Sequence, residues 1–441
     1  MPDIVEKIKN AGVIGAGGAG FPTHVKYKSQ TRWLLANGAE CEPLMHKDRE
    51  LMVNFAPEIV NGIALAAAPV AAKELWIGIK SKNSGAIQAI RDAAKNIDLK
   101  IREFGDFYPA GDEYELVYEI TGKLVPAGGI PLQVDSIVNN VETFYNIYQA
   151  HQNKPVINTF LTITGKVKQP VTLFLPIGTS VRHALEVAGG SLIDDFAVMN
   201  SGILMGKLIK DLDQPIGKTT GGLIVLPKEH RLIQRYSMTK SQMNKIGHSA
   251  CDQCSYCTEL CPRYLLGYDI QPHKVMRSLG FTLTSKEMWN RYAQLCCQCG
   301  ICTLYACPED LYPREACVQS IDNLKEIGVT KWEGPTEVKA HPMKNERRVP
   351  MKLLNNKLGL TPYEAGAHYK ETAYEPPYVR ILLDQHIGVP ARPVVQEKQT
   401  VEKGRLIAEA VPDTPLSAAY HASISGHVTR VTPEGITIER I

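Results

Sequence analysis

The sequence predicts a multidomain protein of α/β and α+β type, and three observations lead to this prediction. Segments typical of strands and helices alternate in the first third of the chain, as they do in an α/β layer. Nine of the 11 cysteines lie between Cys251 and Cys307, in a region of helix-like and loop-like sequence. From Val379 to the end, short β-type segments alternate with turn residues, which is typical of a small all-β domain.

Length and composition exclude several classes of protein. A chain of 441 residues is long enough for about two to four domains. A net charge of +3 is too close to neutral to predict a nucleic-acid partner. No apolar segment reaches the roughly 18 residues that a membrane-spanning helix needs, and the N-terminus lacks the apolar core of a secretory signal. We therefore expect a cytoplasmic protein without a membrane span, whose clustered cysteines bind metal rather than form disulfides.

The first domain is expected over residues 1–150. A short amphipathic helix over residues 3–10 precedes a glycine-rich loop over residues 15–20. Buried strands are expected at residues 33–36 and 75–79, and helices at residues 56–72 and 83–96. This alternation predicts the α/β layer.

Four further segments follow the first domain. Residues 151–235 are predicted to form a small α+β domain, because β-type segments surround one helical stretch at residues 181–188. Residues 236–330 hold the clustered cysteines. Residues 331–375 are predicted to be a linker with local structure, and residues 376–441 the small all-β domain.

Two cysteine runs give the strongest chemical signal. The first run, Cys251, Cys254, Cys257 and Cys261, precedes Pro262, and the second, Cys296, Cys299, Cys302 and Cys307, precedes Pro308. In two-cluster ferredoxins the fourth cysteine of each run binds the other cluster. We therefore predict two [4Fe–4S] clusters, one held by Cys251, Cys254, Cys257 and Cys307, and the other held by Cys296, Cys299, Cys302 and Cys261. Cys41, Cys297 and Cys317 fall outside the pattern and are expected to be packed thiols.

Structural zinc is the alternative for these cysteines. Zinc takes four ligands per ion and prefers paired CxxC knuckles. Three thiolates at two-residue gaps, followed by a fourth before proline, fit iron–sulfur clusters better.

The glycine-rich loop is a weaker signal when taken alone. Glycines allow backbone N–H groups to close on a phosphate, and Lys26 would add a cation. The simpler alternative is a tight turn at the start of a domain. A Rossmann site is disfavoured, although Glu40 lies about where a ribose-binding acid would lie. The loop follows a helix, and Pro22 interrupts the helix that should begin there.

Four ordered segments together resemble one family. They are residues 15–23 with Lys26, residues 37–43 followed by residues 47–49, residues 111–115, and residues 138–143. In this order they resemble the FMN-binding segments of the flavin subunit of respiratory complex I and of the RnfC protein of the Rnf complex.

The resemblance implies a non-covalent FMN and NADH as the electron donor. The FMN phosphate would lie on the loop of Gly15, Gly17, Gly18 and Gly20, and Lys26 would pair with the flavin or its phosphate. The isoalloxazine and ribityl chain would lie near Asn37, Glu40 and Glu42, and the other side would be closed by Asn139, Asn140 and Thr143. Glu113 or Glu115 would lie by the flavin and nicotinamide, and Phe21 would stack on NADH. A surface or capping role is the alternative for each polar residue.

Two other domains carry a resemblance to known modules. Residues 164–167, 176–180 and 188–190 resemble the SLBB domain, of β-grasp type, that follows the FMN domain in this family. Residues 401–409 and 421–428 resemble a barrel-sandwich hybrid domain.

The order of the domains resembles the cobalamin reductases of propanediol-utilisation microcompartments. It implies an NADH-dependent flavin and iron–sulfur reductase that reduces cob(III)alamin towards cob(II)alamin or cob(I)alamin, for reactivation of a B12-dependent diol dehydratase. The implied partners are NADH, cobalamin or an adenosyltransferase that processes it, and shell proteins of a bacterial microcompartment that would enclose the protein. Two alternatives stay open, an Rnf-type or proline-reductase-linked electron carrier and a non-enzymatic electron relay or scaffold.

Overall fold

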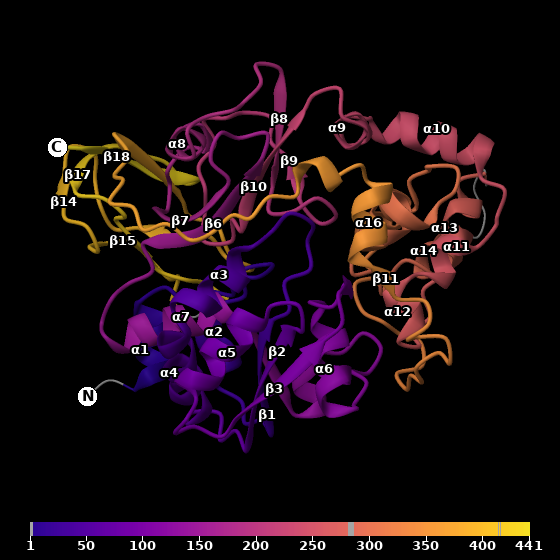
Figure 1. Ribbon diagram of the computed structural model, residues 1–441, viewed down its shortest axis with the longest axis horizontal. Coiled ribbons are helices and arrows are strands. Elements are labelled where there is room, and N and C mark those ends of the chain that lie inside the picture. Colours follow the sequence, from indigo (N-terminus) through magenta and orange to yellow (C-terminus); the bar gives the residue numbers. More distant parts are fainter. Residues whose placement is uncertain (1–2, 281–285, 413, 415) are drawn as a thin grey trace.

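The computed structural model describes residues 3–280, 286–412, 414 and 416–441. Figure 1 shows the N-terminal α/β layer at the bottom, a second β-containing unit above it, the cysteine-rich helices on the right and a C-terminal β unit on the left. The multidomain α/β and α+β class predicted from the sequence is confirmed.

The first domain is built on a four-stranded parallel sheet with the order β3-β2-β1-β5. The strands are β1 (Trp33–Gly38), β2 (Glu74–Lys80), β3 (Leu99–Phe104) and β5 (Ser136–Asn140). Alternate residues of β1 point to opposite faces, so that Leu34 and Ala36 enter one core while Trp33 and Leu35 enter another. Both faces are therefore covered, as is usual for a parallel sheet.

Helices cover the two faces of this sheet unequally. The larger core lies under α1 (Ile4–Asn10), α3 (Lys47–Asn54), α4 (Ala56–Ala67), α5 (Ser84–Ala93) and α7 (Val141–His151). The other face is covered by α6 (Glu113–Thr121), whose Leu116 and Val117 pack against Trp33, Leu35 and Val138. The short elements α2 (Thr23–Lys26), β4 (Phe107–Tyr108) and η1 (Pro131–Val134) lie in the connecting loops.

The second unit contains a mixed five-stranded sheet with the order β7-β6-β10-β8-β9. Its strands are β6 (Asn158–Gly165), β7 (Val171–Pro176), β8 (Phe196–Asn200), β9 (Lys207–Leu208) and β10 (Gly222–Pro227). Strands β6 and β10 are parallel and the other pairs are antiparallel. Helix α8 (Val181–Val187) packs on this sheet through Val181, Ala184 and Leu185. The architecture is α+β, and the SLBB assignment stays a prediction.

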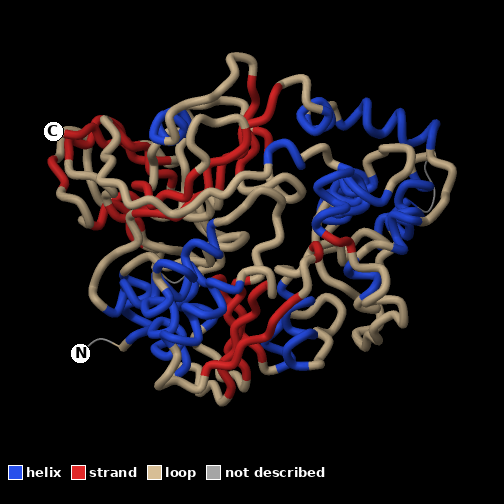
Figure 2. The backbone as a smooth tube through the Cα atoms, in the orientation of Figure 1, coloured by secondary structure: helices blue, strands red, loops and turns tan. Residues whose placement is uncertain are grey.

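The cysteine-rich region consists of short helices and loops in its described residues (Figure 2). They are α9 (Arg231–Tyr236), α10 (Lys240–Ala250), α11 (Tyr256–Glu259), α12 (Pro262–Leu265), α13 (Pro272–Ser278), α14 (Lys286–Arg291), the π-helical turn η2 (Cys302–Ala306) and α15 (Pro313–Glu326). Pro262 and Pro313 each stand in the first turn of a helix, where proline costs no hydrogen bond.

The segment after these helices returns to the first domain. Strand β11 (Val349–Pro350) pairs antiparallel with β4, and α16 (Met351–Lys357) and the 3₁₀ turn η3 (Thr361–Tyr363) follow. The predicted linker thus crosses back over the first domain and joins it through a two-stranded sheet.

The C-terminal unit is a sandwich of two small sheets, with strand orders β12-β18-β17-β14 and β13-β15-β16. The strands are β12 (Tyr378–Leu382), β13 (Arg392–Pro393), β14 (Thr400–Val401), β15 (Leu406–Glu409), β16 (Tyr420–His421), β17 (Gly426–Val431) and β18 (Gly435–Arg440). Their inward side chains form one core.

The C-terminal unit packs directly behind the glycine-rich loop. The Ile387 N–H donates to the Gly20 carbonyl at 3.3 Å. A Cβ on Gly20, which has φ +71°, would lie 2.7 Å from the Gln385 carbonyl, and one on Gly12 would lie 2.2 Å from the Ala419 carbonyl. Only glycine permits these approaches, so the C-terminal unit fixes the back of the loop.

Candidate functional site

The glycine-rich loop lies beside the carboxyl end of β5, at the start of α7. The Ala16 N–H donates to Thr143 Oγ1 at 3.1 Å, and Asn140 Nδ2 lies 3.4 Å from the Asn37 carbonyl at the end of β1. In open α/β sheets ligands bind outside the carboxyl ends of the strands, where neighbouring strands connect in opposite directions. Strand β1 is such a point, because the chain leaves it towards β2 while β5 lies on its other side.

The loop has the backbone needed to receive an anionic group. Gly17 and Gly18 are exposed, and no atom lies within 4 Å of a Cβ built on Gly18. A Cβ on Gly17 would instead lie 2.8 Å from the Cβ of Asn140. Exposed amides beside the first turn of α7 suit a phosphate, so these residues fit the FMN that the sequence predicts.

Lys26, Glu113 and Phe21 form one small group at the edge of this site. Lys26 Nζ donates to the Val138 carbonyl at 2.9 Å and lies 3.8 Å from the Glu113 carboxylate. The same ammonium lies 5.7 Å from the centre of the Phe21 ring. A cation, an anion and an aromatic ring are therefore brought together by α2, α6 and the loop end.

Hydrogen bonds join Asn37 to Gly111, and join both Asn140 and Glu40 to Asp48. Asn37 Nδ2 donates to the Gly111 carbonyl at 2.9 Å, and Asn140 Nδ2 donates to Asp48 Oδ2 at 2.7 Å. Glu40 accepts from the Asp48 N–H at 3.3 Å. Burial, and then the Asp48 charge, raise the pKa of Glu40 to about 8. Glu40 is thus a carboxyl group that keeps its proton at neutral pH.

Asn139 lies deeper than the other members of the predicted site. Its Nδ2 donates to the buried Tyr27 hydroxyl at 2.6 Å, and the side chain is 4% exposed. This contact ties β5 to the segment that follows α2.

Glu42 and Glu115 are engaged away from the glycine-rich loop. The Glu42 carboxylate accepts from the N–H groups of Ile203, Leu204 and Met205 at 2.8, 2.9 and 2.9 Å. Glu115 accepts from Lys344 Nζ at 2.7 Å and from Arg348 at 3.2 Å. Both carboxylates therefore hold other units of the chain against the first domain, and their roles at the flavin stay predictions.

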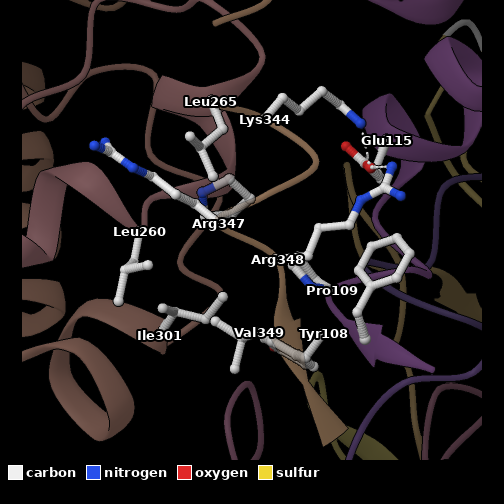
Figure 3. Close-up of a pocket in the computed structure, with 12 residues that line it drawn as sticks. Tyr108, Pro109, Glu115, Leu260, Leu265, Ile301, Lys344, Arg347, Arg348 and Val349 are labelled. Carbon is white, nitrogen blue, oxygen red and sulfur yellow. Dashed lines mark hydrogen bonds and ion pairs between the residues drawn. The ribbon is translucent and has the colours of Figure 1, made fainter. Parts of the chain in front are cut away.

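Figure 3 shows the small cavity beside Glu115. Its volume of about 20 Å³ has room for about one water molecule. The cavity lies between the first domain, the cysteine-rich helices and the returning linker, and is lined by Phe107, Tyr108, Pro109, Glu115, Leu260, Pro262, Leu265, Ile301, Lys344, Arg347, Arg348 and Val349.

The eight predicted ligand thiols divide into two neighbourhoods. Burial, and then the thiols of Cys307, Cys251 and Cys254, raise the pKa of Cys257 to about 12. Burial, and then the thiols of Cys296, Cys261 and, as a smaller effect, Cys257, raise the pKa of Cys302. The fourth cysteine of each run thus lies beside the first three of the other run. Thiols that raise one another's pKa in this way suit a cationic centre, which favours their ionised form.

The sulfurs are not arranged around a single ion. Within the residues that the structure describes, no three Cys, His, Asp or Glu side chains converge as ligands of one metal ion.

One thiol neighbourhood faces the first domain. The Tyr108 hydroxyl donates to the Cys299 carbonyl at 2.8 Å, and Arg263 Nη2 donates to Asp112 Oδ2 at 2.9 Å. In the other neighbourhood, Cys254 is exposed. The group of Cys261, Cys296, Cys299 and Cys302 therefore lies next to the first domain.

Family models match three parts of the chain. The Nuo51 FMN-binding domain matches residues 8–149, a 4Fe-4S dicluster domain matches residues 250–312, and the RnfC barrel sandwich hybrid domain matches residues 365–439. Whole-chain relatives decide the family. The cobalamin reductase PduS of Citrobacter freundii is 38% identical over 438 residues, which cover 99% of this chain and 96% of the relative.

The chain belongs to the PduS family. PduS of Salmonella typhimurium is also 38% identical, over 439 residues that cover 99% of this chain and 96% of the relative. A component of the proton-translocating ferredoxin:NAD(+) oxidoreductase complex of Clostridium ljungdahlii is 30% identical, over 58% of this chain and 55% of that component. As a member of the PduS family the protein is an NADH-linked oxidoreductase with FMN and [4Fe–4S] clusters.

A solved structure supports the fold. The NAD+-reducing [NiFe]-hydrogenase in the H2-reduced state matches with a TM-score of 0.50 and 19% identity, covering 76% of this chain and 64% of that chain. No helix among the described residues has the length and apolar character to cross a bilayer.

Two residues at these sites were not predicted from the sequence. Asp48 binds Asn140, and Arg263 binds Asp112. Asp48 lies in the second family-like segment, which could have indicated it. Arg263 follows the Cys-Pro pair of the first cysteine run, but its partner lies 151 positions away.

Proposed function

We propose that this member of the PduS family reduces cobalamin with electrons from NADH. The observation that carries the proposal is the 38% identity, over 99% of the chain, to relatives named cobalamin reductase. The substrate would be cob(III)alamin, reduced towards cob(II)alamin or cob(I)alamin. The product would serve to reactivate a B12-dependent diol dehydratase.

The first domain would hold FMN on its glycine-rich loop. A bound flavin accepts the two electrons of a hydride and passes them on singly to iron–sulfur clusters. The phosphate would lie on the amides of residues 15–20, and Asn37, Glu40 and Asn140 would face the ring and ribityl chain. The hydrogen bonds among Asn37, Asp48 and Asn140 support this assignment.

NADH would enter beside Lys26, Glu113 and Phe21. Their grouping at the start of α6 supports this assignment, because a cation suits the nucleotide phosphates and an aromatic ring suits a nicotinamide. Glu113 is the better candidate of the two glutamates, since its side chain is 41% exposed, whereas that of Glu115 is 6% exposed and paired with Lys344.

The cysteines would hold two [4Fe–4S] clusters. We assign Cys251, Cys254, Cys257 and Cys307 to one cluster and Cys261, Cys296, Cys299 and Cys302 to the other. The two thiol neighbourhoods support the assignment.

We also propose that the domains end at residues 150, 235, 330 and 375, and that residues 151–235 form an SLBB domain. The protein would be cytoplasmic, would have an adenosyltransferase as a partner, and would be enclosed in a microcompartment by shell proteins.

The test is anaerobic purification followed by assays of iron, sulfide and flavin, and then titration with NADH. The proposal expects about eight irons and one FMN per chain, bleaching of the flavin absorbance by NADH, and reduction of cob(III)alamin followed by its visible spectrum. Lys26→Ala should lower the FMN content, because Lys26 is expected to pair with the flavin or its phosphate, whereas the control Lys28→Ala, beside the site but outside it, should keep the FMN content of the wild type.

Three results would contradict the proposal. Purified protein that contains zinc in place of iron would contradict the assignment of two [4Fe–4S] clusters. Flavin that NADH fails to bleach would favour a non-enzymatic relay. Electron transfer to ferredoxin or to a partner reductase, without reduction of cobalamin, would favour the electron-carrier alternative.

A further inference from the structure

A buried arginine lies between the flavin domain and the cysteine-rich helices. Arg263 occupies the first turn of α12, two positions after Cys261, and is 8% exposed. Its Nη2 donates to Asp112 Oδ2 at 2.9 Å, and its guanidinium carbon lies 3.7 Å from the centre of the Tyr114 ring. Guanidinium keeps its charge at any pH at which the protein is folded, so a permanent positive charge is buried here.

Asp112 ties this charge to the flavin site. Its other oxygen, Oδ1, accepts from the N–H groups of Tyr114 and Glu115 and so caps α6. The next residue, Glu113, pairs with Lys26. One ion pair therefore fixes the start of α6 against the helix that follows Cys261.

Part of the guanidinium has no partner in the described protein. Arg263 Nη1 is buried and makes no hydrogen bond. The same guanidinium is an electrostatic neighbour of Cys297, which stands beside Cys296. A buried N–H without an acceptor is costly, which indicates that a group outside the chain accepts from it.

We propose that Arg263 raises the reduction potential of the cluster held by Cys261, Cys296, Cys299 and Cys302, and that Asp112 offsets part of this effect. The inference rests on the cluster assignment of the proposed function. Reduction adds a negative charge to the cluster, and a nearby buried cation stabilises that charge. Hydrogen bonds to cluster sulfurs act in the same direction. Arg263 is thus a positioning and electrostatic residue rather than a ligand.

The test is a redox titration of the full-length protein, purified without oxygen and followed by electron paramagnetic resonance. The signal of this cluster is identified as the one that Cys299→Ser removes. Arg263→Gln should shift its midpoint to lower potential, and Arg263→Lys should shift it less because the charge is kept. Asp112→Asn should shift it to higher potential, because asparagine still caps α6 while the guanidinium loses its counter-charge.

If Arg263→Gln fails to fold, the midpoint potential of Asp112→Asn still tests the inference. Arg182→Gln is the matched control, since Arg182 pairs with Asp213 in the second unit at an exposed position. Its midpoint should equal that of the wild type. Full iron content with unchanged midpoints in Arg263→Gln and Asp112→Asn would overturn the inference, and so would shifts in the same direction. Wild-type protein without iron would instead overturn the cluster assignment on which the inference rests.

Discussion

Three glutamates of the first domain have different tasks, and their immediate neighbours decide which. Glu113 stands at the edge of the glycine-rich loop beside Lys26. Glu42 accepts three backbone N–H groups of the second unit, and Glu115 pairs with Lys344. The three N–H groups that bind Glu42, and the Lys344 ammonium that binds Glu115, lie 161 or more positions away, so the sequence offered no local signal that separates the three.

Replacing Glu42 should affect stability rather than flavin binding. In Glu42→Gln the remaining carbonyl cannot accept all three N–H groups, and the new amide N–H₂ opposes them. Hydrogen bonds to a charged group contribute about 1.5–3 kcal/mol, so a loss of this order in the free energy of unfolding is expected. Thermal unfolding followed by circular dichroism, with FMN content measured by fluorescence, checks this.

Glu113→Gln is the matched comparison. Its ion pair with Lys26 is partly exposed and 3.8 Å long, and it contributes at most about 1 kcal/mol, so the melting temperature should be nearly unchanged. The KM for NADH should rise up to about fivefold if Glu113 contacts NADH. Loss of FMN from Glu42→Gln at unchanged stability would place Glu42 at the flavin instead.

Glu40 gives the protein a pH-dependent stability. Its pKa is raised from 4.5 to about 8, so between these values the folded state binds a proton that the unfolded state has released. The contribution of Glu40 therefore becomes less favourable as pH rises from about 4.5 to about 8. Glu40→Gln lacks this loss, and its melting temperature relative to wild type should be higher at pH 8 than at pH 5.5. Equal differences at both pH values would show that Glu40 is ionised throughout.

At the scale of elements, local sequence patterns correctly predicted the helices and strands that are stabilised by local interactions. The expected helix over residues 3–10 and the strands at residues 33–36 and 75–79 correspond to α1, β1 and β2. Strands β3 and β5 were not predicted. β3 is an edge strand that carries Lys100, Arg102 and Glu103, and β5 ends in two asparagines, so neither has a continuous apolar pattern. The cysteine runs were readable because ligand spacing is itself a local property.

Ligand and spare cysteines should be distinguishable by iron content. Cys307→Ser should lose one cluster, so that iron falls from about eight to about four per chain. Cys317→Ser should keep all of its iron, because Cys317 is a fully buried thiol on α15 outside the runs. Iron assays, together with electron paramagnetic resonance spectra of the reduced protein, check both variants. Equal losses from the two would require a different ligand set.

At the scale of the whole molecule, three units meet at one buried lysine. Lys218, from the second unit, donates to the Gly12 carbonyl at 2.6 Å and to the Ala419 carbonyl at 2.9 Å. Its Nζ lies 4.2 Å from the centre of the Tyr420 ring. Burial lowers the pKa of Lys218 to about 7. No sequence pattern marks this residue, because each partner lies more than 200 positions away.

Lys218→Met should lower the melting temperature, since it leaves two buried carbonyls unpaired at a cost of about 1–3 kcal/mol each. The folded pKa is lower than the ordinary 10.5, so wild type gains stability as pH rises from about 7 to about 10. The deficit of Lys218→Met should therefore be larger at pH 9 than at pH 7. Lys228→Met, at an exposed position, is the control and should melt like wild type. An equal deficit at pH 7 and pH 9 would mean that Lys218 stays charged in the folded state.

The close approach of the C-terminal unit to Gly12 and Gly20 has a consequence for how such genes can be arranged. The two units are neighbours in space although they stand at opposite ends of the chain, and helix α1 and strand β18 both lie in the left half of Figure 1. The two units are placed against each other by close backbone contacts at Gly12 and Gly20, and these contacts do not depend on the order in which the units are joined along the chain. A rearranged gene that encoded the C-terminal unit ahead of the α/β domain would therefore keep the surface that packs behind the glycine-rich loop.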